Sequence, residues 1–171
     1  SRTNEFPQLT DVQGSDLTVT KGAAARFAAL TALTLTDRSQ TFRADGVGSV
    51  LDLAQVERAE MDGNLQLELT AANGGRIRLP RLANPNGRVR VTARGAGAHI
   101  DLSGVTGRWQ SPTHTWPSLL LVETGGAILI PGVTALERFE VHIADTGVLS
   151  LDPIRALVRC SLTVDGATAH L

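Results

Sequence analysis

Two carboxylates of the chain have a spacing that could serve carbohydrate hydrolysis. Asp52 and Asp101 occupy the same position of a sequence repeat, two repeat units apart. Stacked parallel strands would place them roughly 9.6 Å apart, near the upper end for the carboxyl pair of an inverting glycosidase. Arg78 would lie between them, and a cation favours the ionised carboxylate whereas a general acid must stay protonated. We therefore predict that the chain is not an enzyme; a carbohydrate-active β-helix enzyme, either a polysaccharide hydrolase or a lyase, is the alternative.

Both tryptophans of the chain lie in one segment, residues 108–117, within the longest repeat unit. Repeat proteins often place binding residues in such insertions. Trp109, His114 and Trp116 offer apolar faces with N–H donors, which suits contact with a protein or a glycan. We predict that the segment is a projecting loop and a binding site formed by these three residues. The alternative is that the indoles fold back over the flank of the repeat structure.

Other signatures of chemistry are missing from the sequence. It contains no Gly-x-Ser-x-Gly nucleophile motif, no phosphate-binding loop, no His-Glu-x-x-His and no calcium-binding nonapeptide. Cys160 is the only cysteine, which excludes an intrachain disulfide and a cysteine-based zinc site, and we expect it to pack in the interior. We expect no cofactor and no metal, because the histidines have no ligand spacing: His99, His114, His142 and His170.

Composition limits the partners. The formal net charge is −1 and the hydrophobic share is 42%, so the chain can form a core but has no general basic field for nucleic acid or anionic lipid. No segment approaches the roughly 18 apolar residues of a membrane helix. The N-terminus lacks the basic and apolar regions of a signal peptide, so we expect any export signal to lie outside this sequence.

A repeat of roughly 24 residues organises the whole chain. It is defined by an apolar anchor position, which is followed three residues later by a second aliphatic residue and preceded two residues earlier by a third. This spacing of two predicts a strand with its apolar face inward. The anchors are Phe6, Phe27, Leu53, Leu79, Leu102, Ile130, Leu151 and Leu171.

Two further features complete each repeat unit. A glycine stands five residues before the anchor, which predicts a corner; the set is Gly22, Gly48, Gly74, Gly97, Gly125 and Gly166, with Gly147 displaced by one. Another alternating run precedes the glycine and predicts a second strand, as at Leu17 and Val19, Leu67 and Leu69, Val89 and Val91, Leu119 and Leu121, Val141 and Ile143, and Leu162 and Val164. Apolar residues after the anchor, such as Val12 and Leu33, predict a short third side.

These units predict an all-β fold, a parallel β-solenoid of about seven rungs of roughly 24 residues. A right-handed β-helix is expected, since parallel crossovers are almost always right-handed. Residues 1–171 would form a single domain within a longer repeat protein. A solenoid resembling leucine-rich repeats is the alternative, but the sequence lacks the recurrent Asn or Cys and the helical segment of those repeats.

The residue before each anchor should point outward. The first five residues of this column, Glu5, Arg26, Asp52, Arg78 and Asp101, alternate in charge and predict a surface ladder of ion pairs that opposes register slippage. Phe6 and Leu171 occupy the same repeat position, and neither end of the sequence shows a polar or helical cap. We therefore expect an end to be buried against a neighbouring copy or a continuation of the coil.

The run from Ile100 to Gly107 and the run from Gly74 to Pro80 resemble the β-helical regions of very large bacterial extracellular and adhesin-like proteins. This resemblance covers essentially the whole chain and carries no catalytic signature. It implies a structural or adhesive spacer at the cell surface or outside a bacterial cell, with a protein or polysaccharide as partner.

Overall fold

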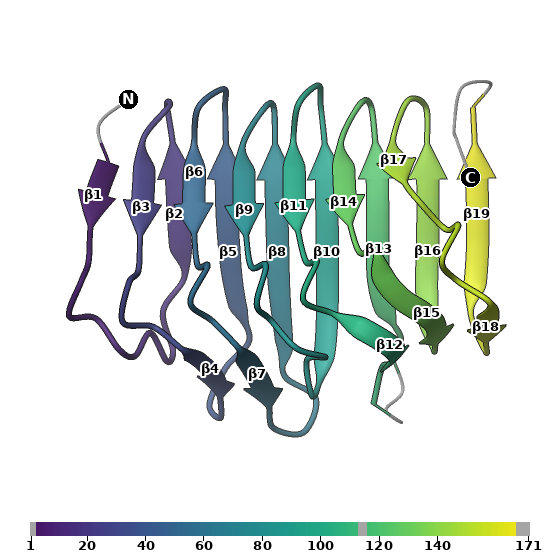
Figure 1. The fold of residues 1–171 in the computed structure, drawn as a ribbon, viewed down its shortest axis with the longest axis horizontal. Helices are drawn as coiled ribbons and strands as arrows, with labels where there is room; N and C mark the ends of the chain where they lie inside the picture. Colours follow the sequence, from purple (N-terminus) through teal and green to yellow (C-terminus); the bar gives the residue numbers. More distant parts are fainter. Residues whose placement is uncertain (1–2, 113–115, 167–171) are drawn as a thin grey trace.

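The computed structural model describes residues 3–112 and 116–166 and shows a parallel β-solenoid of about six turns. Every strand pairing within it is parallel, and the described residues contain no helix. The turns stack along one long axis from the N-terminal to the C-terminal end (Figure 1). The all-β solenoid prediction is confirmed, and the absence of helical segments argues against the leucine-rich-repeat alternative.

Two long sheets form the principal sides of the coil, and their strands run in opposite directions in Figure 1. Sheet A contains the short strands that precede the anchors: β1 (Thr3–Glu5), β3 (Ala24–Arg26), β6 (Val50–Asp52), β9 (Arg76–Arg78), β11 (His99–Asp101), β14 (Ala127–Leu129) and β17 (Val148–Leu149). Sheet B contains longer strands: β2 (Leu17–Thr20), β5 (Gln40–Asp45), β8 (Gln66–Ala72), β10 (Arg88–Arg94), β13 (Ser118–Glu123), β16 (Phe139–Ala144) and β19 (Ser161–Asp165).

A third side closes each turn and is divided into two small sheets. Sheet C pairs β4 (Ala32–Leu35) with β7 (Arg58–Met61), and sheet D joins β12 (Thr106–Gln110), β15 (Gly132–Glu137) and β18 (Ala156–Val158). The long sheets have seven strands each. Seven successive strands of one sheet are separated by six complete turns. The predicted number of about seven rungs therefore equals the number of strands in a long sheet and exceeds the number of turns by one. The last predicted anchor, Leu171, lies outside the described residues.

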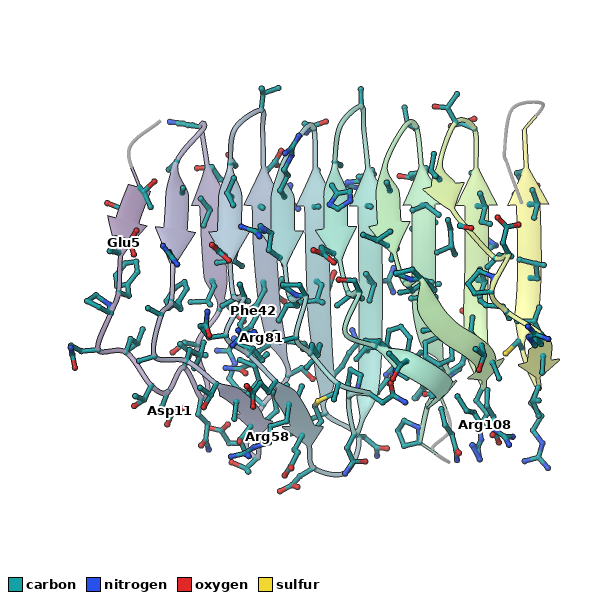
Figure 2. The ribbon with its side chains drawn as sticks, in the orientation of Figure 1. Glu5, Asp11, Phe42, Arg58, Arg81 and Arg108 are labelled. Atoms are coloured by element: carbon teal, nitrogen blue, oxygen red, sulfur yellow. The ribbon has the colours of Figure 1, made fainter. Side chains whose placement is uncertain are left out.

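The predicted inward columns form the core of the inner turns, whereas the terminal anchors differ: Phe6 is exposed and Leu151 is only partly buried. In sheet A the ladder aligns Leu51, Ile77 and Ile100, each fully buried. The anchor residues of the inner turns are also buried, from Phe27 to Ile130, and in Figure 2 the labelled Phe42 of sheet B lies among the side chains that fill the coil. Each large aliphatic side chain so buried contributes about 1.5–3 kcal/mol, which is how stacked turns stabilise one another.

The corner glycines also follow the prediction. Positive φ angles occur at Gly22, Gly48, Gly74, Gly97, Gly125 and Gly166. The displaced Gly147 serves a different need, close approach to the preceding turn: a Cβ there would lie 2.7 Å from the Val122 carbonyl oxygen. Gly75 approaches the preceding turn still more closely, because a Cβ there would lie 2.2 Å from the Ala44 carbonyl oxygen.

The strand predicted from the run at Leu119 and Leu121 is present as β13, but these two residues do not form its inward column. The ladder places Leu120 beside Val91 and Val122 beside Ala93, and these residues are fully buried. Leu119 and Leu121 therefore face outward and are partly exposed. Residues 119–122 are all apolar, so the alternation that fixes the facing of a strand elsewhere is absent here. The consequence is an apolar strip on the outer face of sheet B.

Candidate functional site

Trp109 does not belong to a projecting loop. It lies in β12, is only 1% exposed, and packs against Phe139 with ring centroids 4.9 Å apart. Its ladder neighbour Leu136 is fully buried as well. The indole N–H makes no hydrogen bond in the described part of the chain. Trp109 is a core residue of the third side, and its assignment to the binding site is corrected.

A buried polar network holds this end of the third side together. Glu137 is 7% exposed and is paired with two arginines: it accepts a hydrogen bond from Arg108 Nη2, 2.6 Å from its Oε2, and forms an ion pair with Arg138 Nη1, 3.0 Å from its Oε1. Arg138 also donates to the Ser111 carbonyl oxygen at 3.2 Å. Because both oxygens of this carboxylate are paired with arginines, these contacts offset the free-energy cost of burying its charge. Arg108, at the lower edge of Figure 2, is thereby a structural residue and not part of a loop.

The loop is shorter than predicted because two buried serines close its base. The hydroxyls of Ser111 and Ser118 lie 2.8 Å apart, and Ser118 N–H donates to Ser111 Oγ at 3.2 Å. Val89 N–H donates to Ser118 Oγ at 3.0 Å, which attaches the base to the preceding turn. Of the described residues, Pro112, Trp116 and Pro117 lie between these two serines. The predicted binding residue His114 lies outside the described residues.

Trp116 is the exposed aromatic residue of the segment. Its side chain is 61% exposed and lines a recess of about 300 Å³ on the outer face of sheet B. We call this the Trp116 recess. Pro117 at its edge accepts a hydrogen bond from Arg88 Nε at 3.3 Å, which fixes both groups. The recess is lined by Gln66, Arg88, Val89, Arg90, Trp116, Pro117, Leu119 and Glu140.

The Trp116 recess combines an apolar wall with hydrogen-bonding groups. Trp116 and the outward-facing Leu119 supply the apolar surface, while four polar side chains from neighbouring strands supply donors and acceptors. The sequence prediction found Trp116 but not the polar residues, because their convergence depends on which strands become neighbours. The one available signal was the outward phase of Gln66, Arg88, Arg90 and Glu140 relative to the buried residues beside them.

A second, smaller recess adjoins the first. It measures about 150 Å³ and shares Arg90 with the Trp116 recess. We call it the arginine recess. Its lining consists of Arg43, Glu68, Thr70, Arg90, Thr92, Arg94 and Leu121. The two recesses together cross the outer face of sheet B from β5 to β16.

The predicted charge ladder on sheet A is present at its centre. Asp52 Oδ2 lies 3.5 Å from Arg78 Nη1 and 3.9 Å from Arg26 Nε. Asp52 Oδ1 accepts from Ala54 N–H at 3.2 Å, and Asp101 Oδ1 accepts in the same way from Ser103 N–H at 3.0 Å. Both carboxylates thus stabilise the turns that follow their strands. Asp52 thus has the ion pairs that the charge ladder predicts.

Other candidate chemistry is sparse in residues 3–112 and 116–166. No group of three or more His, Cys, Asp or Glu side chains there is placed to hold a metal ion. His99 lies in sheet A and His142 in sheet B, and His170 lies outside the described residues. Cys160 is partly buried, with its thiol 3.3 Å from the Leu136 carbonyl oxygen. The same residues contain no helix with the length and hydrophobicity to cross a bilayer.

A further recess, on the outer face of sheet A, is apolar. It measures about 450 Å³ and includes the exposed side chains of Leu129 and Val148 together with Pro131 and Pro153. Nothing in the structure shows what covers it. We therefore base no function on this recess.

In comparisons with known proteins, no family model, no curated protein and no solved structure matches this chain. A functional assignment therefore rests on the residues and geometry of the chain itself.

Proposed function

We propose that the chain is a non-catalytic β-solenoid spacer that contacts a polysaccharide through the Trp116 recess. The observation that carries this proposal is the position of Trp116, which is exposed beside a converging set of polar side chains in a chain with only 4% aromatic residues. A placement outside the cell or on a bacterial surface, as the resemblance implies, stays a prediction.

The chemistry of the recess favours a sugar over a protein groove. The C–H faces of a pyranose pack well on an indole, which offers a broad apolar surface at low conformational cost. Sugar hydroxyls donate and accept at once, so they match a set containing an amide (Gln66), a carboxylate (Glu140) and guanidinium groups (Arg88 and Arg90). The solenoid adds rigidity, since ladder hydrogen bonds fix the strands that carry these side chains.

Affinity electrophoresis through gels containing soluble polysaccharides tests the proposal. The panel comprises hydroxyethyl cellulose, carboxymethyl cellulose, dextran and carboxymethyl dextran. We expect at least one polymer to retard the chain, Trp116→Ala to abolish the retardation, and Trp116→Phe to retain part of it because a ring remains. The Tm of Trp116→Ala should stay within a degree or two of the parent, since the side chain is exposed.

Two results would overturn this function. One is a chain that no polymer retards. The other is retardation that persists unchanged in Trp116→Ala, because the contact would then lie elsewhere on the molecule. Val47, which is 84% exposed at a distant corner, provides the matched control: Val47→Ala removes exposed apolar surface outside the recess and should leave the retardation unchanged.

We also propose that the solenoid stacks end to end with a second copy. Support comes from Leu157, Leu162 and Val164 in the last described turn, which are 41%, 41% and 38% exposed. Their ladder partners one turn earlier, Leu136, Val141 and Ile143, are at most 1% exposed. Phe6, at the other end, is 40% exposed although it stacks on Phe27. Within the described residues β1 and β19 each pair on one side only, and such strand edges beside exposed apolar side chains favour stacking.

Sedimentation over a range of concentrations tests the stacking. We expect association that rises with concentration and that Leu162→Asp weakens, because a carboxylate at the uncovered end of the core opposes apolar contact. Leu129→Asp places the same charge on an equally exposed side chain of sheet A and should not weaken it. A strict monomer at all concentrations, or equal effects of the two substitutions, would contradict the stacking.

A further inference from the structure

We propose that the ligand of sheet B is an acidic polysaccharide, whose carboxylates are bound by arginines that extend from the Trp116 recess into the arginine recess. This inference rests on the proposed function, since it names the class of glycan bound at the same site. It concerns four arginines of β5 and β10: Arg43, Arg88, Arg90 and Arg94.

The charges lining the two recesses favour an anion. Four arginines line them together with two glutamates, Glu68 and Glu140. The whole chain carries a net charge of −1, so this excess of cations is a local property of the face. The asymmetry is what a carboxylate-bearing ligand requires, and it is opposite to the overall charge of the chain.

The four arginines differ in their partners: Arg90 has none among the described residues, and Arg94 acts on Asp45 only through its charge, which contributes to the lowered pKa of that carboxyl. Arg43 is held by Asp45, with Nη2 2.5 Å from Oδ2, and Arg88 donates to the Pro117 carbonyl oxygen. The guanidinium groups of Arg90 and Arg94, by contrast, make no ion pair or side-chain hydrogen bond within residues 3–112 and 116–166. Both residues are exposed. A guanidinium presents two parallel N–H donors, the geometry that binds a carboxylate bidentately.

The position of Arg90 and Arg94 suits a chain of sugars better than a single one. Both lie on β10 and point to the same side, because they are four residues apart in a strand. Arg90 belongs to both recesses, with Trp116 on one side and Thr92 and Arg94 on the other. A polymer stacked on Trp116 would therefore pass Arg90 and reach Arg94 along one continuous face.

Two polymer pairs that differ in charge but share a backbone test the inference. The pairs are carboxymethyl cellulose with hydroxyethyl cellulose, and carboxymethyl dextran with dextran. We expect the chain to bind the acidic member of a pair about tenfold more tightly, the effect of one to two charge-assisted hydrogen bonds. Arg90→Gln with Arg94→Gln should remove most of this preference without changing the Tm, and rising NaCl should weaken binding of the acidic polymer alone.

Controls separate this inference from the proposed function. Arg76→Gln removes an exposed arginine from the outer face of sheet A and should leave the preference intact. Equal binding of the acidic and neutral members, abolished by Trp116→Ala, overturns the inference and supports the proposed function. Binding to no polymer overturns both. Polyglutamate binding as tightly as the acidic polymers, with no effect of Trp116→Ala, also overturns the inference, because the face would then be a general anion surface.

Discussion

The two long sheets of the coil are continuous, whereas its third side is interrupted. Sheets A and B each align seven strands in unbroken parallel ladders. The third side is divided into sheets of two and three strands, and residues 83–87 between them form no strand; they join the preceding turn through the isolated bridge from Asn86 to Glu60 and a hydrogen bond from Ala83 N–H to the Glu57 carbonyl oxygen. Pro85 lies in this interval and lacks the N–H that a ladder needs.

A side chain compensates for the break. Asn84 Nδ2 donates to the Arg108 carbonyl oxygen at 2.9 Å, and Asn84 Oδ1 accepts from Thr106 N–H at 3.0 Å. The amide thereby replaces two backbone hydrogen bonds to the next turn. The third side can thus lose a strand while the long sheets keep their register. The comparison teaches that two sides specify the fold and the third accommodates variation, including the residues beside the candidate site.

The largest expected effect tests the specifying role of the long sheets. Ile100→Asp should destabilise the chain by more than about 4 kcal/mol, because it buries an unpaired charge in a column that is fully buried on both neighbouring strands. Urea unfolding measures it. His99→Asp places the same side chain one residue away, pointing outward, and should cost less than about 1 kcal/mol. Similar costs at the two positions would refute the facing of the strand.

Trp109 tests whether the variable side also contributes to the core. Trp109→Ala should cost about 3–5 kcal/mol, since it leaves a cavity beside Phe139 and Leu136. Trp116→Ala, seven positions later in the sequence, should change stability by less than about 0.5 kcal/mol. Urea unfolding of the two variants compares them directly. A stability loss for Trp116→Ala as large as that for Trp109→Ala would show that both indoles are structural.

Gly75 tests the close approach of successive turns. Gly75→Ala should destabilise by about 1–3 kcal/mol, because the added methyl meets the Ala44 carbonyl oxygen and neither turn can move without disturbing its ladder. Gly63→Ala is the control for the same substitution: its Cβ would meet no atom within 4 Å, although its φ of 56° carries a backbone cost of about 1 kcal/mol. Calorimetric melting of both variants should rank Gly75→Ala as the less stable.

The smallest expected effect concerns a corner of sheet B. The Asn73 amide, 2.9 Å from Asp45 Oδ1, and then Arg43 lower the pKa of Asp45. A lowered pKa in the folded state contributes stability above the unfolded value of about 3.9, and this stability is lost as the pH falls through the folded pKa. Asp45→Asn should therefore reduce the Tm at pH 7. The corresponding loss in the free energy of unfolding should be less than about 1 kcal/mol, because the pair is near the surface. The difference should vanish in acid; a Tm difference that is independent of pH would contradict this.

Much of the fold follows from the sequence because the same physical need recurs in every turn. Leu51, Ile77 and Ile100 had to be apolar, and Gly74 had to adopt positive φ, so their columns were visible without a structure. The facing of Leu119 could not be predicted from the sequence, since its neighbours in the strand are apolar on both faces. The burial of Trp109 was predicted only as the alternative to a binding role, because composition marks a tryptophan near an insertion as unusual but does not say whether it packs inward.

The candidate site was predictable only in part for the same reason. Trp116 was identified from the repeat length, whereas Arg88, Arg90 and Glu140 become neighbours of Trp116 only through the strand order of sheet B. The closing of the loop by Ser111 and Ser118 carries no sequence signature, because isolated serines are common at surfaces.

Fluorescence of single-tryptophan variants tests the central claim most directly, that Trp116 contacts a polysaccharide while Trp109 is structural. In Trp109→Phe only Trp116 emits, and titration with carboxymethyl cellulose should shift its emission to shorter wavelength in a saturable way as water leaves the indole. In Trp116→Phe only Trp109 emits, from the core, and the same titration should leave it unchanged. A Trp116 emission that no polymer of the panel alters, or a response confined to Trp109, would contradict the account.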